Sequence, residues 1–225
     1  MPSRRSVDLS PATLLHAYAQ GAFPMADSRT GHVAYYTADP RAILPLDAFH
    51  IPHGLRRRLK RCPFTITRNA AFREVITACA QPRPGQHSGG DGTWINDDII
   101  DAYCRLHDLG FAHSVEAWAC PSSPSSLAPP PSSLLLGGLY GVALGGAFFG
   151  ESMFSRATDA SKTCLVHLVE HLRQQGFVLL DTQFANPHLT QFGLIELPAH
   201  DYLRRLQDAV TKPASFLPLA ASSGS

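Results

Sequence analysis

Apolar residues recur at helical spacing in four segments of the chain. Ser10 and Pro11 precede one apolar stripe, a pattern that predicts a capped helix ending at Gly21. Similar stripes, bounded by residues that favour helix ends, predict three more helices. These helices follow Asn96 and end at Gly110, follow Asp159 and end at Gly176, and run from about His200 to Val210.

The stretch from Ser133 to Gly150 has eighteen residues and no charged side chain. Its length approaches that of a membrane-spanning helix, and three of its glycines are four residues apart, as in packed membrane helices. However, six of the eighteen residues are glycine, and each lowers helix stability by about 1 kcal/mol relative to alanine. Because Gly145-Gly146 is a turn signal between two apolar runs, the stretch predicts a buried hairpin of residues 134–144 and 147–149.

Two further segments, Ala112–Ala119 and Phe177–Asp181, have the composition of strands. Together with the hairpin and the helices, they predict a mixed α/β or α+β sheet. Residues 121–133 are nearly all Pro, Ser, Ala and Leu and lie between two strand patterns, so we expect a flexible loop insertion there. The tail, residues 213–225, is expected to be disordered.

Positive charge is concentrated in one part of the chain. Lys and Arg total 19 and Asp and Glu total 18, which gives a net charge of +1. Seven of the basic residues and no acidic residue lie between Ile51 and Arg73, which leaves 12 basic and 18 acidic residues elsewhere. A basic segment of this kind attracts a polyanion.

The cysteines and the N-terminus indicate the cellular compartment. The five cysteines are widely spaced and form no C-x-x-C pair, which argues against a disulfide framework and against a cysteine-based zinc site. The first residues include two arginines but no apolar segment after them, so a signal peptide is not expected. We therefore expect a reduced, cytoplasmic protein.

Three motifs contain residues that could carry chemistry. His167, Glu170 and His171 match H-x-x-E-H, a zinc-site pattern, but the sequence marks no third ligand. Ser152 lies in a motif that begins like the G-x-S-x-G nucleophile turn, but the second glycine is missing. Glu151 ends a very apolar segment, where a carboxylate needs a cationic partner, either inside the protein or in a ligand.

Asp181 and Gln183 end the last apolar strand pattern. Residues two apart in a strand point to the same side, so these two polar groups are expected to face one space. There they could hold and orient an attacking amine, or they could simply bond to backbone groups of a loop. The connection over residues 155–162 lacks Gly-x-Gly, so an acyltransferase built on this pattern would not hold its donor as coenzyme A.

The chain resembles the bacterial leucyl/phenylalanyl-tRNA–protein transferases over nearly its whole length. The shared motifs occur in the same order along the chain, and Gly150–Ser155 is the most distinctive of them. The others are Asp8–Pro11, Gly21–Pro24, Asp39–Arg41, Gly92–Ile95, Ala102–His107, His113–Glu116, Gly137–Val142, Ala160–Lys162, Asp181–Gln183 and Pro187–His188.

The resemblance implies an α+β protein with a small N-terminal domain, residues 1–40, and a catalytic domain, residues 41–212. The catalytic domain would have the acyltransferase fold of the acetyltransferase (GNAT-like) superfamily. The implied reaction moves Leu, Phe or Met from aminoacyl-tRNA to the α-amino group of proteins that begin with Lys or Arg, which marks them for degradation in the N-degron pathway. No metal or cofactor is implied, and we expect a monomer with no membrane partner.

The resemblance also implies roles for individual residues. Gln183 would accept a hydrogen from the attacking amine with support from Asp181, and Glu151 and Ser155 would bind the acceptor. The pocket for the aminoacyl side chain would be lined by residues that are equally typical of an ordinary core, namely Leu139, Phe148, Met153, Leu165, Leu168 and Leu180. The tRNA would contact Trp94 and a basic run, Arg56, Arg57, Arg58, Lys60 and Arg61, whose positive charges suit phosphate groups.

The sequence departs from the family pattern at several positions. Met25 stands where that pattern has a tryptophan that stacks on the terminal adenine, and Tyr35-Tyr36 replaces a double tryptophan. Two other interpretations remain open. A related transferase for acceptors that begin with Asp or Glu is disfavoured by the charge of Glu151, and a non-catalytic RNA-binding protein is disfavoured by the polar pair that ends the strand.

Overall fold

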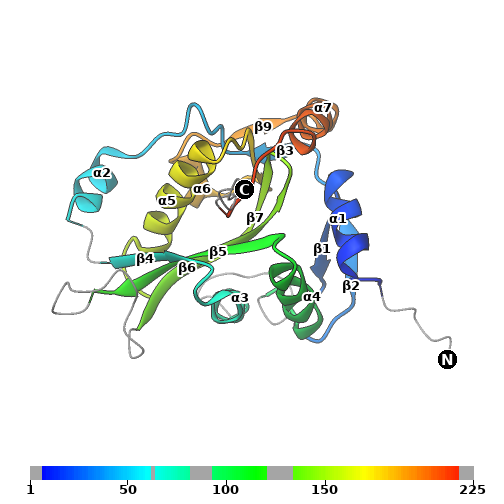
Figure 1. Ribbon diagram of the computed structural model, residues 1–225, viewed down its shortest axis with the longest axis horizontal. Coiled ribbons are helices and arrows are strands. Elements are labelled where there is room, and N and C mark those ends of the chain that lie inside the picture. The colour runs from blue at the N-terminus through cyan, green and yellow to red at the C-terminus, as the bar shows by residue number, and fades with distance from the viewer. Residues whose placement is uncertain (1–6, 62–63, 82–92, 121–133, 218–225) are drawn as a thin grey trace, which may run out of the picture.

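The protein, seen here in a computed structural model that describes residues 7–61, 64–81, 93–120 and 134–217, is built on one mixed sheet of seven strands (Figure 1). Neighbouring strands are antiparallel, except that β7 and β8 run parallel. In sheet order the strands are β4 (Phe64–Arg68), β5 (Ala112–Ala119), β6 (Leu135–Leu144), β7 (Ala147–Ser155), β8 (Leu179–Gln183), β3 (Arg41–Ile43) and β9 (Ile195–Leu197).

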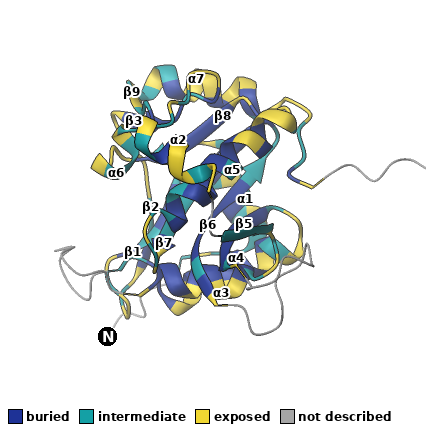
Figure 2. Ribbon diagram, turned by 90° about the vertical axis from the view of Figure 1, so that its left-hand side faces the viewer, coloured by how far each residue is buried: buried dark blue, intermediate teal, exposed yellow. Residues whose placement is uncertain are grey.

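Helices cover both faces of the sheet and create two apolar cores. One face is covered by α5 (Ala160–Gln174), whose buried side chains belong to the same cluster as Leu139 of β6 and Phe148 of β7. The opposite face is covered by α3 (Phe72–Cys79) and α4 (Asp97–Asp108). In Figure 2 the central strands are buried, whereas α2 (His53–Leu59) is largely exposed. The α+β class expected from the sequence is confirmed.

The N-terminal part is small and packs against the same sheet. It consists of α1 (Pro11–Ala19) and the two-stranded antiparallel sheet of β1 (Phe23–Ala26) and β2 (Val33–Tyr36). Leu14 and Tyr18 of α1 are fully buried in the core that α3 and α4 share. The chain closes with α6 (Pro187–Thr190) and α7 (Ala199–Val210). A core of this kind fixes the N-terminal part against the strands that carry the candidate site.

The local signals located the long helices correctly. The Ser10 side chain accepts from the Thr13 amide at 3.4 Å, and the Asn96 side chain accepts from the Ile99 amide at 2.9 Å, so both predicted caps are confirmed. Asp159 stands at the predicted start of α5 but does not cap it. Its backbone is left-handed and its carboxylate turns to Arg58 and Lys162 instead, which makes that part of the prediction wrong.

The apolar stretch forms the predicted hairpin, with its turn at Gly145, whose φ is +54°. Its second strand is longer than expected, because polar residues continue β7 to Ser155. The strand predicted at 177–181 lies two residues later. In the described part of the chain, no helix is long and apolar enough to cross a membrane.

The two segments predicted to be flexible have different outcomes. Residues 121–133 lie outside the described residues, so the predicted loop insertion stays a prediction. The tail prediction is wrong for residues 213–217. These residues pack against the protein through Phe216, which is only 2% exposed. Its aromatic side chain is buried in the apolar cluster between α5 and the sheet.

Candidate active site

The candidate site lies where β7 and β8 part. The two strands pair only from Ala147 with Leu179 to Phe149 with Asp181. Beyond that point β7 carries a bulge, because Gly141 pairs with Gly150 while Tyr140 pairs with Ser152. Glu151 is the extra residue of this bulge. Bulges re-aim a side chain and are common beside active sites.

Asp181 is a fully buried carboxylate with every acceptor position in use. Its Oδ1 accepts from Arg41 Nε and from the Gln183 backbone amide, both at 2.9 Å. Its Oδ2 accepts from Arg41 Nη2 at 2.6 Å and from the Tyr202 hydroxyl at 2.7 Å. A carboxylate offers about four lone pairs, so Asp181 has no acceptor position left for an incoming amine.

Arg41 ties the N-terminal part to this carboxylate. Its side chain is 1% exposed, and Nη1 donates to the Gly21 carbonyl at 2.8 Å. The guanidinium lies between the rings of Phe23 and Tyr202, 4.6 Å from each centroid. Sequence reasoning included Arg41 in a shared motif but gave it no role. The signal that could have found it is the buried carboxylate itself, which requires a cation.

Gln183 has an unusual backbone and a buried side chain. Its φ is +60°, in the left-handed region that non-glycine residues adopt at a cost of order 1–3 kcal/mol, often at functional sites. The side chain is 6% exposed. With the carboxamide assigned from its hydrogen bonds, the nitrogen donates to the carbonyls of Gly150 at 2.9 Å and Thr182 at 3.0 Å. Asp181 contacts the backbone amide of Gln183, and the expectation that the two side chains face one space stays a prediction.

Glu151 receives hydroxyl groups where a cation was expected. Tyr18 donates to Oε1 at 2.7 Å and Tyr103 donates to Oε2 at 3.2 Å, and the two hydroxyls also contact each other. Burial raises the pKa of Glu151 to about 8, the nearby Asp181 charge adds to the increase, and the tyrosine hydrogen bonds and Arg41 oppose it. Within the described residues no Lys, Arg or His lies within 4.0 Å of this carboxylate, so the internal salt bridge considered from the sequence is absent there.

The sequence did not identify the two tyrosines as partners of Glu151. Tyr18 and Tyr103 look like ordinary members of apolar helix stripes, and both are fully buried. Nothing local shows that their hydroxyls meet a carboxylate that lies 133 and 48 residues away along the chain. Ser155, the other residue expected to bind the acceptor, is not brought to this place. It is four residues further along β7, and its hydroxyl bonds to the Ala157 carbonyl and the Ser161 amide.

The residues expected to line the aminoacyl pocket gather in one cluster on the α5 face of the sheet. Five of them are at most 3% exposed, and Met153 is partly exposed. The cluster is close to the polar residues along the chain, since Met153 follows Glu151 by two residues on β7 and Leu180 precedes Asp181 on β8. The tyrosine partners of Glu151 and Asp181 belong to the other core. The full set is Leu139, Phe148, Met153, Leu165, Leu168 and Leu180.

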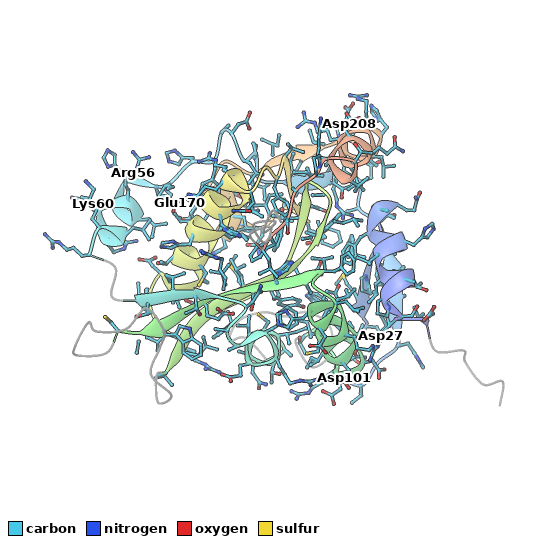
Figure 3. The ribbon with its side chains drawn as sticks, in the orientation of Figure 1. Asp27, Arg56, Lys60, Asp101, Glu170 and Asp208 are labelled. Carbon is cyan, nitrogen blue, oxygen red and sulfur yellow. The ribbon has the colours of Figure 1, made fainter. Side chains whose placement is uncertain are left out.

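The basic run forms an exposed helix at one end of the molecule. Figure 3 shows Arg56 and Lys60 pointing away from α2, while Asp27, Asp101 and Asp208 lie toward the other end. A pocket of about 630 Å³ lies beside α2, lined by several of the basic residues and by Asp159. Arg58 donates to Asp159 at 2.5 Å, so the basic run has an acidic neighbour that the sequence did not reveal.

Two other sequence candidates lie elsewhere. The backbone carbonyl of Trp94 accepts from the Ala26 amide at 3.0 Å, which places Trp94 beside β1, far from α2 in Figure 1. His171 is turned inward, where its Nε2 donates to the Phe216 carbonyl at 2.7 Å, whereas His167 is 39% exposed and lies 3.9 Å from Glu170. These two histidines therefore have different surroundings.

Comparison with known proteins assigns the chain to a class of enzyme. The profile of the family described as leucyl/phenylalanyl-tRNA protein transferase matches residues 43–207, and the profile of that family's N-terminal domain matches residues 7–39. The chain is therefore an aminoacyltransferase. It belongs to the leucyl/phenylalanyl-tRNA–protein transferase family, which confirms the resemblance drawn from its motifs.

Individual relatives agree with this assignment. Curated leucyl/phenylalanyl-tRNA–protein transferases from Akkermansia muciniphila and Hyphomonas neptunium are each 50% identical to the chain, over 90% and 94% of its length and 96% and 76% of theirs. That from Gloeobacter violaceus is 47% identical over 93% of this chain and 98% of its own. Among solved structures, L-PGS from Bacillus licheniformis matches 80% of this chain and 55% of its own with a TM-score of 0.43 and 13% identity, too weak a likeness to define the fold family.

Proposed function

We propose that this protein moves Leu, Phe or Met from aminoacyl-tRNA to the α-amino group of proteins that begin with Lys or Arg, a step that marks those proteins for degradation in the cytoplasm. The family assignment supports aminoacyl transfer. One observation supports the choice of acceptor: the partly buried Glu151 side chain accepts from two tyrosine hydroxyls and has no Lys, Arg or His within 4.0 Å among the described residues. A basic side chain entering beside it would supply the missing charge.

The proposed chemistry requires positioning more than a strong base. The acceptor amine attacks the ester carbonyl of the donor, the bond from that carbon to the tRNA ribose oxygen breaks, and the proton lost by the amine goes to that oxygen. Gln183 would accept a hydrogen bond from the attacking N–H group, which orients its lone pair. The amide nitrogen of Gln183, bound to the Gly150 carbonyl, would keep the side chain in place.

We assign Asp181 to positioning. It holds the Gln183 backbone amide at 2.9 Å, and its other acceptor positions belong to Arg41 and Tyr202. These contacts would keep Gln183 in its left-handed backbone conformation. This geometry favours a support role for Asp181 over direct proton transfer, a choice that sequence reasoning left open.

The donor would be held at two places. Its aminoacyl side chain would enter the apolar cluster on the α5 face of the sheet, and its phosphates would lie along α2, where Arg56, Arg57 and Lys60 are exposed. Phosphate contacts give affinity without reading the sequence. Trp94, beside β1, would contact the tRNA near its aminoacylated end. The acyltransferase fold of the acetyltransferase superfamily is consistent with the parting of β7 and β8 and remains part of this proposal.

The test compares acceptor peptides that differ only in the first residue, Arg, Ala or Asp, with saturating leucyl-tRNA. We expect transfer to the Arg peptide in preference to the other two, and Glu151→Gln should weaken binding of the Arg peptide by about 2–5 kcal/mol, the usual effect of breaking a buried charge pair. The loss should be small for the Ala peptide. Preference for the Asp peptide would favour the related transferase class, and unchanged discrimination in Glu151→Gln would contradict the assignment.

A further inference from the structure

The C-terminal segment after α7 returns to the sheet and places one aromatic side chain under α5. Phe216 stacks on His113 of β5, with ring centroids 4.2 Å apart and planes at 9°. It meets the His171 ring edge-on at 4.6 Å. Its carbonyl accepts from His171 Nε2 at 2.7 Å. Three contacts from two elements, β5 and α5, therefore fix a residue that belongs to no helix or strand.

Phe216 also touches the cluster proposed to hold the donor side chain. Its ring lies 5.6 Å from that of Phe148 at an angle of 27°. On α5, His171 follows Leu168 by three residues, which places the two on one face of the helix. The Phe148 ring itself lies over Gly141, since a Cβ at Gly141 would come within 2.4 Å of it. The Phe148 ring thus has Gly141 and Phe216 as neighbours.

The members of the cluster differ in exposure. Met153 is partly exposed and lies two residues after Glu151 on β7. Phe148 lies three residues before Glu151, pairs with Leu180 and is 0% exposed, and Phe216, which packs against its ring, is 2% exposed. A side chain that enters beside Phe148 would therefore have Phe216 behind that ring.

We propose that Phe216 is a specificity-determining residue, because it forms the end wall of the donor pocket and limits the size of the aminoacyl side chain. This proposal rests on the proposed function of the apolar cluster. The wall is stiff, since two imidazole rings and a hydrogen bond hold it, and a stiff wall discriminates by size. Rejection of one methylene in an apolar pocket is commonly worth about 10- to 200-fold in rate.

The experiment measures kcat/KM for transfer from leucyl-, phenylalanyl- and tryptophanyl-tRNA to one Arg-initiated peptide. We expect Phe216→Ala and Phe216→Leu to raise the ratio of tryptophanyl to leucyl transfer at least about tenfold. Ratios within one preparation do not depend on the fraction of active enzyme, so a partly unfolded variant still gives an answer. Phe216→Leu is included because it retains most of the apolar volume.

Phe192→Leu is the matched control. Phe192 is 0% exposed and belongs to the same apolar cluster, but its ring stacks on Phe49, 5.3 Å away. We expect this variant to lose stability without changing the donor ratio. Leu139→Ala, inside the proposed pocket, should change the ratio.

The outcomes separate the two proposals. A ratio that changes in Leu139→Ala but not in either Phe216 variant would overturn the end-wall proposal and leave the pocket intact. Equal changes in Phe192→Leu and Phe216→Leu would also overturn it. Faster transfer from all donors in the Phe216 variants, with the ratio unchanged, would identify Phe216 as a plug. If the wild-type protein transfers none of the three amino acids, the proposed function fails.

Discussion

Asp181 and Glu151 are carboxylates on neighbouring strands, the first fully and the second partly buried, and their hydrogen-bond partners are of opposite kinds. Asp181 at the end of β8 receives two hydrogen bonds from Arg41, one from Tyr202 and one from a backbone amide. Among the described residues, Glu151 in the bulge of β7 receives only the hydroxyls of Tyr18 and Tyr103. In that part of the chain, Asp181 is in contact with a cation, whereas Glu151 has none within 4.0 Å.

Under the proposed function, this difference would separate a structural carboxylate from one that binds the acceptor. A buried charge with its own cation and a full set of hydrogen bonds is satisfied and has nothing to offer a ligand. A buried carboxyl group without a cation holds its proton up to a higher pH, as the pKa of about 8 for Glu151 indicates. Such a group loses its proton readily only when a positive group lies beside it. That behaviour is expected of a site that selects basic acceptors.

The largest effect should come from breaking the satisfied pair. Asp181→Asn keeps the shape of the side chain but leaves Arg41, 1% exposed, without its counter-charge. Removing one partner of a buried pair typically costs about 3–5 kcal/mol, so we expect the free energy of unfolding to fall by that amount. Urea unfolding followed by circular dichroism measures it. A loss below about 1 kcal/mol, the range of exposed pairs, would show that Arg41 finds another partner.

How far the sequence predicts the fold depends on whether the signal is local. Ser10, Asn96 and Gly145 act on residues a few positions away, and the elements they predict are present. Asp159 is an exception, because the local signal for a helix cap was present but its side chain does not cap the helix. Its side chain has a cap position within reach but is drawn to Arg58, 101 residues away, and no local pattern reveals that competition.

The sequence pointed to the polar residues of the candidate site but not to their partners. Asp181, Gln183 and Glu151 were identified because polar groups at the ends of apolar strands are unusual. Arg41, which lies 140 residues from Asp181 in the chain, and the two tyrosines were not identified, since the sheet order that brings β3 beside β8 cannot be read from the sequence. Phe216 was assigned to a disordered tail because the segment after Lys212 ends in Ala-Ser-Ser-Gly-Ser.

The second prediction uses pH to sharpen the comparison. The ordinary pKa of Glu151 is 4.5 and the folded value is about 8. Between these values the folded state holds a proton that the unfolded state releases, so stability falls as pH rises. This contribution is fully present below about pH 4.5 and is lost by about pH 8, and the shift corresponds to a few kcal/mol.

Glu151→Gln removes the titration, so the variant should gain stability relative to the wild type between pH 5 and pH 8. Denaturation midpoints at several pH values in this window measure the difference. Asp181 provides the contrast, because Asp181→Asn should be less stable than the wild type throughout the same range. Parallel pH profiles for Glu151→Gln and wild type would mean that the carboxylate is already ionised in the folded protein.

The smallest effect on stability is expected at a third carboxylate, Asp159. Like Asp181 it forms an ion pair with an arginine, but this arginine is exposed to water. Asp159, 9% exposed, contacts Arg58 and Lys162, whose side chains are 57% and 23% exposed, so water reaches the cationic side of both pairs. Exposed pairs contribute about 0–1 kcal/mol, so Asp159→Asn should change the free energy of unfolding by less than about 1 kcal/mol. Its effect on tRNA binding should be larger, since it frees two cations beside the pocket lined by α2.

We expect Asp159→Asn to bind tRNA more tightly and with a steeper dependence on salt, because each additional phosphate contact releases counterions. The double change Arg57→Ala and Arg58→Ala should do the opposite, weakening binding and flattening the salt dependence. Affinity measured by filter binding between 50 and 200 mM salt compares the three proteins. Weaker binding by Asp159→Asn would show that Asp159 holds Arg58 in the orientation that the tRNA requires, which would make this exposed pair a positioning device like the buried pair of Arg41 and Asp181.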